Sequence, residues 1–153
     1  MALEISTVGA KVKFAFEASA GSRPTSGYTE LPNVSSAPDF PMDVEMLDAS
    51  DITDLITRYI PGRQDPGTDK EFTLNHTEAV ISAWASLVAS ASAAKASGLA
   101  TWFEYVYPGA TTSYFWKGEP VALGNGGIEQ NAVDTIPAKV VPQGGNVWAT
   151  AST

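Results

Sequence analysis

The pattern of apolar and polar positions along the chain predicts several short strands in its first half. Residues 11–17 (KVKFAFE) alternate polar and apolar side chains, which is the period of a strand with one buried face. Residues 28–31 (YTEL) can form a second strand that Pro32 ends, and residues 71–74 (EFTL) a third. The serine-, glycine- and proline-rich segment 18–27 is typical of a loop.

One segment has the spacing of a helix, over residues 77–97. Its large apolar residues recur at intervals of three and four and form one stripe: Val80, Ile81, Trp84, Leu87 and Val88. Asn75 or Thr77 can cap its start, and Lys95 followed by Gly98 marks its end. The segment carries no charge from 79 to 94, but its serines and one-sided stripe favour packing against a sheet over a membrane span.

Strand signals return after the helix. Residues 99–107 and 112–117 are rich in aromatic side chains and flank the turn Pro108-Gly109, which predicts a hairpin. Residues 120–123 and 128–141 supply further strand material, and the last residues are expected to be a loose tail anchored by Trp148. The sum is one α+β domain over residues 1–153, an antiparallel β-sandwich or open β-barrel with one flanking helix and flexible termini.

The long connection at residues 38–70 is the most unusual stretch. It contains four prolines and, between residues 39 and 54, six acidic side chains, followed by apolar residues. A solvated acidic loop is one interpretation. The other is that residues 42–67 form an arm that is mobile in the free subunit and becomes ordered only when it docks on a neighbouring copy through its anchors, since apolar, aromatic and arginine side chains are typical of interfaces. Those anchors are Leu55, Ile56, Tyr59, Ile60 and Arg63.

Charge and residue usage narrow the possible functions. The chain has 153 residues with 9 basic and 17 acidic side chains, a net charge of −8, which disfavours tight binding to nucleic acid. Cysteine is absent and His76 is the one histidine, so a zinc site or a catalytic triad is not expected. The acidic residues lack the spacing of a calcium-binding loop. We therefore expect no enzyme activity, no metal and no cofactor, and the N-terminus shows no signal peptide.

The order of these segments resembles a known family. Residues 28–34 (YTELPNV) lead into the acidic stretch, and residues 56–65 (ITRYIPGRQD) resemble the passage "y-i-p-G-x-x-D" of the major tail proteins, or tail tube proteins, of long-tailed bacteriophages. A short strand, the helix, a strand ending in Pro108-Gly109 and an aromatic return strand follow in the family's order. The likeness covers residues 11–145, and the tube proteins of contractile tails and type VI secretion share this architecture.

This resemblance implies a structural role in the virion tail. Family members form six-membered rings that stack into a hollow tube, which conveys double-stranded DNA into the host during ejection. The implied partners are copies of the same chain, the tape-measure protein, and the tail terminator and tail tip proteins, with assembly in the host cytoplasm and no membrane. Charge agrees with this role, because an acidic wall repels the phosphates of passing DNA.

Two other classes of function remain open at this point. A β-sandwich module that binds a carbohydrate or a receptor would need an exposed aromatic platform, for which the strand residues Trp102, Tyr105, Tyr114 and Trp116 are the candidates. Their alternation within strands favours a core or an interface instead. An enzyme is the weakest of the three because the catalytic set is missing.

Overall fold

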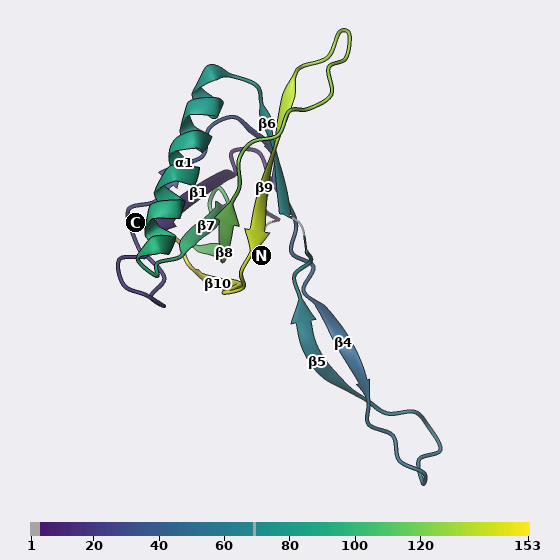
Figure 1. Cartoon of the computed structure of the whole chain (residues 1–153). Helices are drawn as coiled ribbons and strands as arrows, with labels where there is room; N and C mark the ends of the chain where they lie inside the picture. Colours follow the sequence, from purple (N-terminus) through teal and green to yellow (C-terminus); the bar gives the residue numbers. More distant parts are fainter. Residues whose placement is uncertain (1–3, 69) are drawn as a thin grey trace.

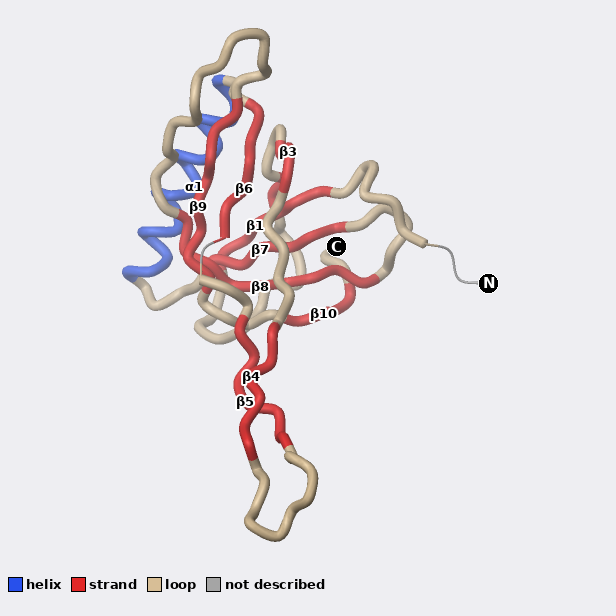
Figure 2. The backbone as a smooth tube through the Cα atoms, turned by 90° about the vertical axis from the view of Figure 1, so that its right-hand side faces the viewer, coloured by secondary structure: helices blue, strands red, loops and turns tan. Residues whose placement is uncertain are grey.

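The computed structural model describes residues 4–68 and 70–153, which form a curled antiparallel sheet, one helix and a separate hairpin (Figure 1). The elements follow in the order β1 (Lys11–Phe16), β2 (Thr29–Glu30), β3 (Val34–Ser36), β4 (Asp43–Asp48), β5 (Tyr59–Asp65), β6 (Lys70–Asn75), α1 (Glu78–Ala96), β7 (Thr101–Val106), β8 (Thr112–Pro120), β9 (Thr135–Pro142) and β10 (Val147–Thr150). The main sheet has the order β2-β1-β7-β8-β9-β6-β3, with β10 paired to β8. The predicted α+β class is confirmed: the sheet curls into a half-barrel with α1 along one side (Figure 2).

The long strand β8 explains how one sheet becomes a half-barrel. Its first residues pair with β10 on one edge and with β7 on the other, and its last residues pair with β9. Gly118 lies where the partner changes, and a Cβ atom there would come within 2.4 Å of Val140 and 2.6 Å of the Trp116 ring. The side chain of Val140 and the indole therefore occupy the space that any larger residue at position 118 would need, so glycine permits this close approach.

Helix α1 follows the capping rules closely. Thr77 is its N-cap, and the threonine hydroxyl accepts a hydrogen bond from the amide of Val80 at 3.2 Å, so Thr77 rather than Asn75 caps the helix. Gly98 has a φ of +75° just after the last turn, a conformation that glycine adopts without strain. By length and composition alone α1 is apolar enough to cross a membrane, yet its apolar stripe packs into the protein core.

The buried stripe of α1 is narrower than the spacing predicts. Val80, Trp84 and Leu87 are almost completely buried, and Val88 is half-buried against the same core. Ile81 is predicted to belong to this stripe, and that prediction is wrong, because 38% of the residue remains exposed. It lies at the flank of the helix, one position beyond Val80, where the sheet no longer covers it.

The core on the helix side is built from stacked aromatic rings. Phe103 and Trp116 stack with ring centroids 4.6 Å apart, and Phe72 stacks on Trp116 at 6.1 Å. On the opposite face of β7 the Glu104 carboxylate is fully buried and accepts hydrogen bonds from both the amide and the hydroxyl of Ser152. These bonds satisfy carboxyl oxygens that would otherwise be costly to bury.

Three segments differ from what the sequence predicts. The stretch expected as a long loop over residues 38–70 contains the β4–β5 hairpin, which projects from the body (Figure 1). The end of the chain, expected to be loose, forms β10 on the edge of β8. The strand expected from residue 128 begins only at Thr135, so residues 121–134 form a loop at the end of the body opposite the hairpin.

Candidate assembly surface

The most distinctive surface is the projecting hairpin, which we call the arm (residues 43–65). Strands β4 and β5 pair only with each other and form a separate two-stranded sheet. Leu47 lies opposite Ile60, and Asp48 lies opposite Tyr59. A β-bulge interrupts the register between Val44 and Met46, where β5 carries an extra residue.

Both faces of the arm expose apolar side chains. Successive residues of a strand point to opposite faces, so the Leu47–Ile60 pair occupies one face and Met46 and Tyr59 lie on the other. All four are exposed, with Tyr59 60% accessible. An isolated two-stranded hairpin is at best marginally stable in water, because it has no third layer to cover its apolar side chains. The arm therefore has the composition of a surface that is covered in an assembly.

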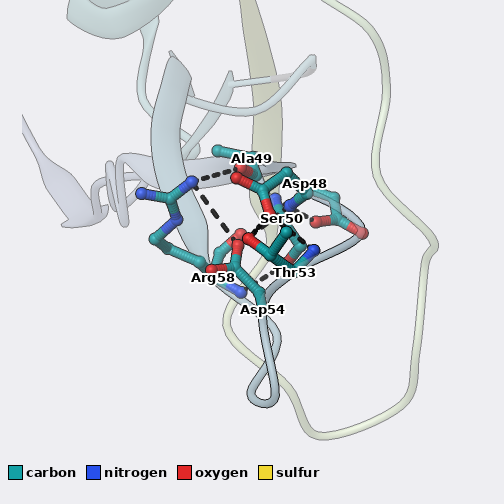
Figure 3. A network of polar contacts seen from close by, with 7 residues as sticks. Asp48, Ala49, Ser50, Thr53, Asp54 and Arg58 are labelled. Carbon is teal, nitrogen blue, oxygen red and sulfur yellow. Dashed lines mark hydrogen bonds and ion pairs between the residues drawn. The ribbon is translucent and has the colours of Figure 1, made fainter.

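The tip of the arm (residues 49–58) is held by its own polar contacts (Figure 3). The amide of Ala49 donates to the carbonyl of Arg58, and the Arg58 guanidinium returns a bond to the Ala49 carbonyl at 2.9 Å. The same guanidinium lies 3.5 Å from the Asp54 carboxylate. Carboxylates of Asp51 and Asp54 also accept backbone amides within the loop. These contacts give the tip a defined shape without a hydrophobic core beneath it.

The polar network turns the tip's aliphatic side chains outward. Ile52 and Leu55 are completely exposed and Ile56 is nearly so. Three aliphatic residues at the end of an extended hairpin resemble the apolar anchors of protein interfaces. That the segment is mobile in the free subunit stays a prediction.

Acidification is expected to loosen the tip. Hydrogen bonds from the Ser50 amide and hydroxyl lower the pKa of Asp48, and those from the Thr53 hydroxyl and amide lower the pKa of Asp51. Because both pKa values are lower than in an unfolded chain, this stabilisation is full above the ordinary aspartate range, near pH 4, and is lost as pH falls through the lowered values. In an NMR titration, both carboxyls should titrate below the ordinary aspartate pKa.

One variant serves as the control for that titration. Thr53→Ala removes the hydroxyl donor to Asp51 and should move the Asp51 midpoint upward while leaving that of Asp48 unchanged. Midpoints at the ordinary aspartate value in the unmodified chain would contradict the ordered tip.

The root of the arm is fixed to the body by a buried lysine. Lys70 is 4% exposed, its ammonium donates to the carbonyl of Asp39 at 2.5 Å, and it lies 4.5 Å from the centroid of the Phe40 ring. Phe40 in turn packs on Trp116 with ring centroids 4.7 Å apart. Burial raises the pKa of Tyr105, which stays protonated and donates to the Pro38 carbonyl at 3.0 Å. Buried contacts therefore hold the segment from which the arm leaves the body.

A groove lies beside this root, on the body itself. A cavity of about 970 Å³ is enclosed by the chain segment 33–42 on one side and by the ends of β1 and β7 on the other. Its apolar lining includes Val12, Tyr107 and Trp148, and a neighbouring cavity of about 550 Å³ shares the last two. We call the larger cavity the aromatic groove. Trp148 is 60% exposed and stacks against Tyr107, with ring centroids 6.2 Å apart.

The predicted contact residues all belong to the arm, though in two different settings. Leu55 and Ile56 lie in the tip, whereas Tyr59, Ile60 and Arg63 lie on β5 and are exposed. Sequence reasoning missed the aromatic groove, because its walls come from segments far apart in the chain. Trp148 was the one available signal, as an isolated large aromatic near the C-terminal end.

The described residues offer little support for the alternative functions. All four aromatic residues proposed as a binding platform, Trp102, Tyr105, Tyr114 and Trp116, are buried in the body. His76 contacts Asp134 at 2.5 Å at the junction of β6 and α1, where it ties two loops together. Over residues 4–68 and 70–153, no group of three potential metal ligands gathers.

Comparison with known proteins identifies the fold. No protein-family model and no curated protein matches the chain. Among solved structures, the chain is similar to a chain of the sixfold-symmetrised cryo-electron-microscopy structure of the anti-feeding prophage baseplate. The TM-score is 0.53 at 9% sequence identity, and the match covers 100% of this chain and 98% of the other. The whole chain thus has the fold of a protein chain found in that baseplate.

Proposed function

We propose that this chain is a structural subunit of a phage-type tail or of a related injection particle, where it assembles with copies of itself. The observation that carries the proposal is the arm: a two-stranded hairpin with apolar side chains on both faces and at its tip, whose root is held by buried contacts. Such a surface is costly to leave in water and has no partner within the described chain. The fold shared with a chain of a sixfold baseplate supports the same role.

In the proposed assembly, six copies form a ring and rings stack into a hollow tube in the virion tail. The arm of each copy reaches the neighbouring ring, with Leu55, Ile56, Tyr59, Ile60 and Arg63 in the contact. The resemblance of residues 56–65 to the tail tube passage and the acidic charge of the chain support a conduit for double-stranded DNA. A tape-measure protein inside the tube, and terminator and tip proteins at its ends, would complete the tail.

Imaging of the purified chain at high concentration tests this proposal. Domains of this size have a gyration radius of about 15 Å, and several of them around a pore give a tube about 100 Å wide. We expect rings or stacked tubes by electron microscopy and a matching high mass by sedimentation. Monomers alone at every concentration, also with a tape-measure protein added, would contradict a tube subunit.

A further inference from the structure

We propose that the aromatic groove is the receptor for the arm, so that the tip of one copy docks beside Tyr107 and Trp148 of another copy. This inference rests on the proposed function and deepens it, because it names the surface that the arm contacts. It joins two features of the described chain, the exposed aliphatic tip and the groove on the body, whose lining combines aromatic with polar side chains.

The geometry requires that tip and groove belong to different copies. The segment that walls the groove runs directly into β4, and the arm then extends away from the body (Figure 2). Strands of six and seven residues at about 3.3 Å per residue carry the tip some 20 Å away from its own groove. Contact between two different patches on identical chains is heterologous and propagates from copy to copy, as stacking requires.

The size and chemistry of the groove also match those of the tip. The groove, about 970 Å³ in volume, falls within the range of pockets that bury a drug-sized ligand, which is ample for Ile52, Leu55 and Ile56. Aromatic side chains in a concave site are the usual partners of apolar anchors, and Trp148 offers a large exposed surface there.

Charge argues against the simplest competing occupant, a second arm. Residues 43–65 contain six acidic and two basic side chains, a net charge of −4, whereas the charged residues that line the groove are Lys11, Glu30 and Asp39, a net charge of −1. A second arm would therefore repel an arm more strongly than the groove does. The other exposed apolar site is the loop at residues 121–134, with Ile128 and Val133. That loop contains no aromatic residue, and it therefore lacks the anchors that the groove provides.

Disulfide trapping between copies tests the inference. Because the chain has no cysteine, the introduced cysteines are the only ones that can form a disulfide. A Leu55→Cys copy is mixed with an isotope-labelled Ser36→Cys copy, assembled, and oxidised mildly. Ser36 lies at the groove and is exposed. A disulfide needs Cα atoms within about 7 Å, so the mixed crosslink reports direct proximity. By mass spectrometry, the yield of the 55–36 disulfide should be several-fold higher than the yield of the mixed disulfide in either of two comparison mixtures. These mixtures combine Leu55→Cys with Gln130→Cys and Leu55→Cys with Ser86→Cys.

The two comparison mixtures distinguish the remaining possible results. Ser86 is exposed on α1 and measures random collision, whereas Gln130 reports docking on the 121–134 loop. Dominant 55–130 crosslinks, dominant 55–55 crosslinks between two arms, or assembled tubes with no enrichment at position 36 would overturn the groove as receptor and leave the tube proposal standing. If imaging of the same samples shows no assembly, both proposals fail.

Discussion

Replacing Trp84 with alanine is expected to lower the free energy of unfolding by roughly 3–5 kcal/mol, the range for large buried aromatic side chains. Trp84 is 1% exposed, packs beside Phe72 with ring centroids 6.5 Å apart, and donates from its indole to the Val121 carbonyl at 2.7 Å. The substitution opens a cavity between α1 and the sheet and removes the donor to that carbonyl. Urea unfolding followed by circular dichroism measures the change.

Ile81→Ala is the matched control for Trp84, because it lies on the same helix but outside the buried stripe. Because the Ile81 side chain is partly exposed, this substitution should lower the free energy of unfolding by about 1 kcal/mol or less, close to the range of ordinary surface substitutions. Equal losses for the two variants would mean that α1 packs differently from the arrangement described. An unchanged stability of the Trp84 variant would place the stripe outside the core.

The double substitution of Tyr59 and Ile60 with serine is expected to abolish tube elongation while leaving the body folded. The two side chains lie on opposite faces of β5, both are exposed, and neither belongs to the core. The change therefore removes apolar contact area from both faces of the arm without opening a cavity. Melting temperature and circular dichroism should match the unmodified chain, whereas sedimentation and electron microscopy should show only small species.

The control for this variant is Val121→Ser with Val141→Ser, which removes two exposed valines from the body. It should assemble as the unmodified chain does. If the Tyr59 and Ile60 variant elongates normally, the arm is not the stacking contact. Failure of both variants to assemble would point to a general effect of lost apolar surface rather than to the arm.

The sequence was sufficient for those elements in which local pattern and packing agree. The helix at 78–96, with its Thr77 cap and Gly98 stop, and the aromatic hairpin of β7 and β8 follow from periodicity and turn residues. Ile81 shows the limit of this reasoning, because spacing alone cannot tell how wide a stripe the sheet will cover. The C-terminal strand β10 was missed for a similar reason: its pairing depends on the open edge of β8, which is distant in sequence.

The sequence likewise predicts part of the arm but nothing of the groove. Apolar residues among prolines and acids indicate a contact segment, but the same prolines and acids disfavour a stable local structure, so the sequence predicts a long loop there. Pro61 instead lies in a hairpin beside a bulge, on strands that have open edges where a missing amide costs little. The aromatic groove required segments 33–42, β1, β7 and β10 to meet, and no local pattern in the sequence reports such a convergence.

The separation of the arm from the core also has an evolutionary consequence. Arm residues make almost no contact with the folded body beyond their root, so mutations there are free of the packing constraints that hold Phe72 or Trp116 in place. If the arm carries recognition between copies, as proposed, that recognition can change quickly while the scaffold stays the same. Two diverging lineages would then build assemblies that no longer mix their subunits, each with an unchanged fold.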